Sequence, residues 1–73
     1  MDTTRLEQDY EEARAAAEEA GLQSLSLAQL QQLIAGACWD DGADPEVAIE
    51  TSQAYDTVDA ARHYLVQAFG YKE

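Results

Sequence analysis

Residues 26–39, with the sequence SLAQLQQLIAGACW, form the stretch that decides the fold. The stretch has no charged side chain, and its apolar residues recur at spacings of three and four. That rhythm places one set of them on a single helix face: Leu27, Leu30, Leu33, Ile34 and Ala37. Ser26 and Gln29 have the spacing of a capping box, which marks a helix start. We predict a helix over roughly 27–38 that forms the centre of the core.

The uncharged region around this helix extends from Gly21 to Trp39, a length close to that of a membrane span. Its serines and glutamines would not be tolerated together in hydrocarbon, so we interpret it as a water-facing helix with a neutral polar face. Residues 1–5 lack a basic stretch followed by an apolar one. We therefore expect no signal peptide and a cytoplasmic protein, located in the host cytoplasm if a phage encodes it.

The segment before the central helix has its own helix signals. Thr4 and Glu7 have capping-box spacing, and Gly21 is a natural stop. Between them runs an apolar stripe with a four-three rhythm, made of Leu6, Tyr10, Ala13, Ala17 and Ala20. We predict a helix over roughly 5–20, and its alanines would allow a neighbouring helix to approach closely.

The segment after the central helix contains two more helix starts. Asp44, Pro45 and Glu46 have the order of cap, first helical position and first turn. A helix over 45–53 follows, although the β-branched residues of 46–51 also fit a short strand. Residues 56–59 start a last helix over 57–69 that ends at Gly70. The apolar stripe keeps its four-three rhythm through both segments, so the alternative is that they form one bent helix.

The fold class that these segments predict is all-α, a small antiparallel bundle of three or four helices in a single domain, 1–73. The alternative is an α+β fold with an edge strand near 46–51. A chain of 73 residues has room for one thin core and for no second domain.

The net charge of −11, from fifteen acidic and four basic residues, is distributed unevenly. Residues 1–20 carry −5, residues 21–39 carry no charge, and residues 40–59 carry seven acids and no base. So acidic a chain does not bind nucleic acid through phosphate contacts, and anionic membranes repel it. Arg5 and Arg14 can pair with acids within their own helix, whereas we expect the acids of 40–59 to have no such relief.

No motif points to catalysis, a cofactor or a metal, so we expect a protein that is not an enzyme. His63 is the only histidine, and Cys38 reads as a buried thiol because a nucleophile needs a base beside it. A calcium loop starting at Asp40 fails at its third, sixth and twelfth positions. Residues 56–59 (Asp-Thr-Val-Asp) resemble the attachment site of acyl carrier proteins, without the serine that would carry the phosphopantetheine arm.

What remains is an acidic surface that fits a basic protein, foremost one that handles nucleic acid. The residues that we expect to make the contact are Trp39, Asp40, Asp41, Asp44, Glu46 and Glu50, followed by Glu11, Glu12 and Glu18 of the first helix. Trp39 has a competing interpretation as a lid on the core.

In size, acidity and helical content the chain resembles small inhibitors from phages and mobile elements, such as anti-CRISPR proteins and DNA mimics. Residues 27–41 also resemble part of the colicin-type immunity proteins. Both resemblances imply inhibition by electrostatic and steric occlusion. The alternative is a helical adaptor or a homo-oligomer, for example a homodimer, that uses the alanine stripe of 5–20.

Overall fold

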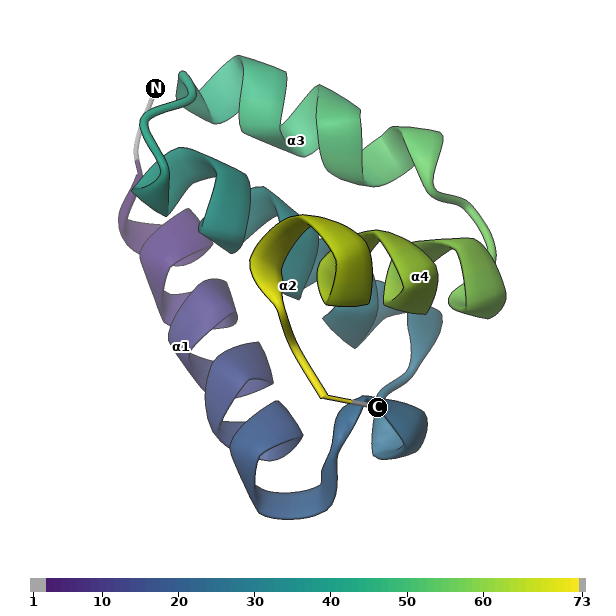
Figure 1. Ribbon diagram of the computed structural model, residues 1–73. Helices are drawn as coiled ribbons and strands as arrows, with labels where there is room; N and C mark the ends of the chain where they lie inside the picture. Colours follow the sequence, from purple (N-terminus) through teal and green to yellow (C-terminus); the bar gives the residue numbers. More distant parts are fainter. Residues whose placement is uncertain (1–2, 73) are drawn as a thin grey trace.

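Helix α2 (Leu27–Asp40) lies at the centre of the fold and packs against every other α-helix (Figure 1). The computed structural model describes residues 3–72. Around α2 it places α1 (Thr4–Ala20), the 3-10 turn η1 (Leu22–Ser24), α3 (Pro45–Ala54) and α4 (Val58–Phe69). No strand occurs in these residues, so the all-α bundle is confirmed and the edge strand near 46–51 is wrong.

The core is built on the predicted face of α2. Leu30, Leu33 and Ile34 are fully buried, together with Leu22 of η1 and Leu65 of α4. The capping box is present, since the Gln29 N–H donates to Ser26 Oγ (3.2 Å) and the Ser26 N–H donates to Gln29 Oε1 (2.9 Å). Two orphan donors of the first turn are thereby satisfied, and the helix starts at the predicted residue.

The contact between α1 and α2 depends on small residues. Ala13 is only 1% exposed, and the backbone of Gly36 lies directly under the ring of Tyr10, where a Cβ atom would overlap that ring. The capping box at Thr4 is wrong, because Thr4 is already helical and Thr3 occupies the N-cap without a side-chain cap bond. The stripe of α1 is otherwise as expected, except that Ala20 is exposed.

Residues 45–54 form a helix although they include β-branched side chains. Pro45 stands at the first turn, and the hydroxyl of Thr51 donates to the Val47 carbonyl (2.8 Å) within the same helix. The neighbouring Ser52 hydroxyl donates likewise to the carbonyl of Ile49 (2.7 Å). These local bonds satisfy the hydroxyls inside a helix and remove their advantage in a strand.

Helices α3 and α4 are separate and cross the molecule in opposite directions, so the single bent helix is also wrong (Figure 1). The break begins at Tyr55, whose carbonyl accepts a bond from Gln31 Nε2 of α2 (3.1 Å). Thr57 then caps α4 by accepting from the Ala60 N–H (3.2 Å). The glutamine of the neutral α2 face thus anchors the turn between the last two helices.

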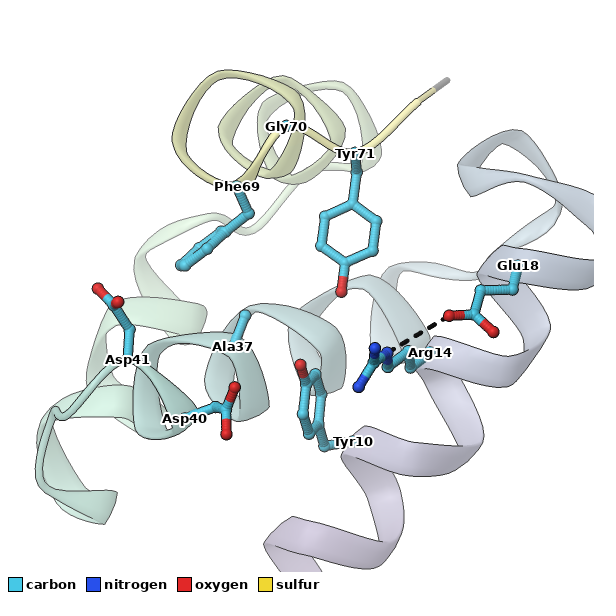
Figure 2. A pocket seen from close by; sticks show the side chains of 9 residues that line it. All are labelled: Tyr10, Arg14, Glu18, Ala37, Asp40, Asp41, Phe69, Gly70 and Tyr71. Carbon is cyan, nitrogen blue, oxygen red and sulfur yellow. Dashed lines mark ion pairs between the residues drawn. The ribbon is translucent and has the colours of Figure 1, made fainter.

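The end of α4 directs the last described residues back across the molecule. Gly70 adopts a left-handed conformation (φ 72°), and the Tyr71 N–H donates to the Leu65 carbonyl (3.3 Å). This glycine turn is a common way to end a helix. It carries Tyr71 towards α1, where the side chain is half-buried (Figure 2). None of the helices in residues 3–72 combines the length and the apolar character needed to cross a membrane.

Candidate partner-binding surface

A groove of about 410 Å³ opens where α1, the end of α2 and the residues after α4 meet (Figure 2). Three predicted contact residues line it together, Asp40, Asp41 and Glu18. The rest of the lining consists of Tyr10, Arg14, Ala37, Phe69, Gly70 and Tyr71. Acidic groups from two distant parts of the sequence therefore share one concave surface with three aromatic rings.

Asp40 and Asp41 occupy the carboxyl end of α2. Asp40 is the last helical residue, and Asp41 is the C-cap, whose N–H donates to the Ala37 carbonyl (3.0 Å). Both side chains are exposed, and the last turn of α2 contains no basic residue. The carboxyl end of a helix carries partial negative charge, so two carboxylates placed there raise the free energy of the folded chain.

The opposite end of the groove holds a guanidinium group of the chain itself. Arg14 Nε lies 3.4 Å from Glu18 Oε1, and Figure 2 shows the tip of Arg14 beside Tyr10 and below the hydroxyl of Tyr71. The electrostatic influence of Tyr10, followed by that of Glu18, raises the pKa of Arg14. Burial of the ring raises the pKa of Tyr71 to about 12. The surroundings thus favour the charged form of Arg14 and the neutral form of Tyr71.

The remaining predicted contact residues lie outside this groove. Asp44 is the N-cap of α3, and Glu46 and Glu50 are exposed along that helix. Glu11 and Glu12 are exposed on α1. The predicted surface therefore consists of a concave part at the end of α2 and exposed helical faces on α3 and α1.

Trp39 is half-buried, next to Asp40 in the chain. It belongs neither to the main hydrophobic cluster nor to the groove lining. Its role as an anchor for a partner stays a prediction.

Ion pairs relieve two acids of α1 and, against expectation, one acid of 40–59. Arg5 pairs with Asp9 (3.8 Å), and Arg62 reaches back to Asp59 (2.8 Å). The prediction that the whole 40–59 block has no relief is therefore wrong at Asp59, because Arg62 lies one helical turn further along α4. Asp9, Glu18 and Asp59 are the carboxylates within residues 3–72 that pair with a basic side chain. The acids of the α2–α3 junction have no such pair within these residues: Asp40, Asp41, Asp44 and Glu46.

The alanine stripe of α1 is used inside the fold. Ala13 is buried in the main cluster, and Ala16 and Ala17 pack against it. A dimer that used this stripe would have to displace α2.

Cys38 and His63, the two residues considered above for catalysis or metal binding, lie in different surroundings. Cys38 is half-buried, and its Sγ lies 3.5 Å from the hydroxyl of Tyr64. This hydrogen bond is the largest cause that raises the pKa of Tyr64 to about 12, with burial second. His63 is exposed. Within residues 3–72, no three side chains of His, Cys, Asp or Glu are gathered closely enough to share a metal ion.

A second groove, of about 440 Å³, lies between α1, α2 and α3. Leu6, Ala28, Ala35 and Ile49 supply its apolar lining, and Gln31, Gln32 and Gln53 contribute amides. Its only charged lining residues, Arg5 and Asp9, pair with each other. It therefore offers no charge for attracting a basic protein.

The groove was not predicted from the sequence, because Tyr71 was not among the expected contact residues. The available signal was the glycine after the last helix, since a left-handed turn there redirects the chain. Comparisons with family models, with curated proteins and with solved structures gave no match for this chain.

Proposed function

We propose that this protein is a non-enzymatic inhibitor that binds a basic, nucleic-acid-handling protein and covers its nucleic-acid-binding surface. The observation that supports the proposal is the group of unpaired carboxylates around the α2–α3 junction: Asp40, Asp41, Asp44 and Glu46. All four are exposed, and within residues 3–72 none has a basic side chain within ion-pair distance. Their mutual repulsion raises the free energy of the free protein, and a basic partner would offset it.

The mechanism is electrostatic steering followed by steric occlusion. An acidic surface accelerates encounter with a basic cleft, most strongly at low salt. Once docked, the carboxylates take the positions that phosphates would occupy, and nucleic acid is excluded. No turnover is involved. In this respect the protein would act like the DNA-mimic and anti-CRISPR inhibitors that it resembles in size and charge, and inhibition of a nuclease by an immunity-type protein would use the same surface.

Self-association through the alanine stripe of α1 fits less well. Ala13 and its neighbours already pack against α2, so α1 would have to leave the core. A carrier role also fits less well, since the Thr57 hydroxyl is engaged as the cap of α4.

The test requires a partner, which affinity capture from a host lysate and mass spectrometry would supply. The purified partner is then mixed with labelled nucleic acid, and displacement by this protein is measured in a gel-shift assay. We expect displacement that weakens as salt rises, because long-range attraction is screened. Absence of displacement, or displacement that salt does not affect, would overturn the proposal.

Charge reversal locates the contact. The triple variant Asp40→Lys, Asp41→Lys, Asp44→Lys should lose displacement while its circular dichroism spectrum stays helical. The matched control is Glu7→Lys, Glu19→Lys, Asp56→Lys, which makes the same change in net charge at exposed positions outside the proposed contact. Equal losses in both variants would show that net charge acts alone and that the α2–α3 junction has no special role.

A further inference from the structure

The groove at the end of α2 differs from the rest of the acidic surface because its walls are aromatic. Tyr10 stands on α1, and Tyr71, after the end of α4, extends towards it (Figure 2). The ring of Phe69, the last residue of α4, points to the side of the groove where Asp41 lies. Asp40 and Asp41 lie on the same groove. The acids of α3 do not line this groove, and an acidic cluster alone would not define a ligand.

Aromatic rings combined with carboxylates recognise one chemical group especially well. A guanidinium is flat, so it can stack on a ring while its N–H groups donate to carboxylate oxygens. An ammonium group has no flat face for stacking, and a phosphate or a carboxylate would be repelled by Asp40 and Asp41. The lining therefore selects for arginine.

The same groove already holds one guanidinium of the chain near a ring and a carboxylate. The guanidinium of Arg14 lies beside Tyr10 and pairs with Glu18 at 3.4 Å (Figure 2). The half formed by Asp40, Asp41 and Phe69 repeats the combination of ring and carboxylate. However, neither aspartate pairs with a basic side chain within residues 3–72.

We propose that this half of the groove seats the guanidinium group of an arginine side chain of the partner. The inference rests on the proposed function, since it names the anchor through which the basic partner is held. An arriving guanidinium would also neutralise the two carboxylates at the carboxyl end of α2, where the helix itself disfavours them. The arginine would enter from the open side, and the surrounding acids would contact the rest of the basic surface.

The test uses N-acetyl-arginine amide as the probe and does not need the partner. Titration into ¹⁵N-labelled protein, followed by amide shifts, should move resonances of Asp40, Asp41, Gly70 and Tyr71. N-acetyl-citrulline amide has the same shape without the charge and should leave them unmoved. Equal shifts with both probes, or shifts spread evenly over all exposed acids, would overturn the inference.

Matched neutral variants locate the site. Asp40→Asn, Asp41→Asn should weaken binding of the arginine probe about tenfold, the size expected when charge-assisted hydrogen bonds are lost. Glu46→Gln, Glu50→Gln removes the same charge from α3 and should leave probe affinity nearly unchanged. Circular dichroism establishes that both variants fold. Equal weakening by the two variants would contradict a site in the groove.

The two proposals can fail separately. If the partner still releases nucleic acid in a salt-dependent way but the arginine probe leaves the groove resonances unmoved, the inhibitor proposal stands and the arginine site is wrong. If the probe binds in the groove but the partner keeps its nucleic acid, the arginine site stands as a property of the surface and the inhibitor proposal fails.

Discussion

Helices α2 and α3 pack against each other, yet α2 is the more buried and is nearly uncharged, whereas α3 is the more exposed and is acidic. α2 carries no charge before its last residue, and six of its residues in the stretch 30–37 are buried. α3 buries only Ala48 and Ser52 and exposes Glu46, Val47 and Glu50. The buried residues of α2 thus stabilise the fold, whereas the exposed residues of α3 are accessible to a partner. A small domain can therefore carry a costly acidic surface, provided that the acids lie outside the buried stretch of its central helix.

Removing one side chain from each helix tests this difference most directly. Leu33→Ala in α2 should lower the free energy of unfolding by about 2–5 kcal/mol, because Leu33 is completely buried and a cavity would remain. Val47→Ala in α3 should change it by less than about 0.5 kcal/mol, because Val47 is 51% exposed. Urea denaturation followed by circular dichroism measures both. Comparable losses would mean that α3 contributes to the core as much as α2 does.

The next largest effect concerns the backbone contact between α2 and α1. Gly36→Ala should destabilise the fold by about 1–3 kcal/mol, because the new methyl group overlaps the ring of Tyr10. At an ordinary position inside a helix, the change from glycine to alanine would instead raise the free energy of unfolding by about 0.5–1 kcal/mol.

The background of Tyr10→Ala provides the control for that contact. With the ring removed, Gly36→Ala should cost much less, and the coupling appears as a non-additive double-mutant cycle. Additive effects, or a stabilising Gly36→Ala in the native background, would contradict the close approach.

Acids at the two helix ends should respond with opposite signs. Neutralising Asp40 and Asp41 at the carboxyl end of α2 should raise stability by about 0.3–1 kcal/mol per residue at low salt. Glu46→Gln, in the first turn of α3, should lower it by a similar amount, since an amino-terminal carboxylate is favourable there. Thermal melts at low and high salt measure both changes. If neutralisation changed stability in the same direction at both ends, the acids at the end of α2 would not be destabilising through the helix dipole.

The smallest effect at neutral pH concerns the two tyrosines with raised pKa values. The hydroxyl of Tyr64 forms a hydrogen bond with Cys38 of α2, and Tyr71 lies over the groove. Each tyrosine has its pKa raised from 10 to about 12. A raised pKa means that folding favours the neutral phenol, so this stability is complete below pH 10 and is lost as pH rises towards 12.

Urea midpoints measured across that pH range test the effect. Stability should fall between pH 10 and 12, and the double variant Tyr64→Phe, Tyr71→Phe should reduce the fall. An unchanged fall in the double variant would assign the pH dependence to other groups.

The fold could be predicted from sequence wherever the signal was local. Ser26 and Gln29 form their capping box, and the Asp44–Pro45–Glu46 order starts α3 as expected. The errors arose where two local signals competed. Thr3 took the cap position instead of Thr4, and the hydroxyls of Thr51 and Ser52 found carbonyls inside a helix.

The groove could be predicted only in part. Asp40, Asp41 and Glu18 were expected at the contact, but their meeting depends on how α1 crosses α2. That crossing depends on Gly36, whose close approach to Tyr10 has no signal in the surrounding sequence. Tyr71 reaches the groove because Gly70 turns the chain back, which is a local step, and because α4 packs against α2, which is a tertiary one.

The half-buried position of Trp39 has a practical consequence. It is the only tryptophan, so all indole fluorescence comes from one site at the end of α2. Unfolding should fully hydrate the ring and shift its emission to the red, and the unlabelled chain would report this optically. Trp39 precedes Asp40 in the chain, so we expect its quantum yield to respond to charge that a partner places near the end of α2. The protein therefore carries an intrinsic optical reporter next to the surface proposed to bind a partner.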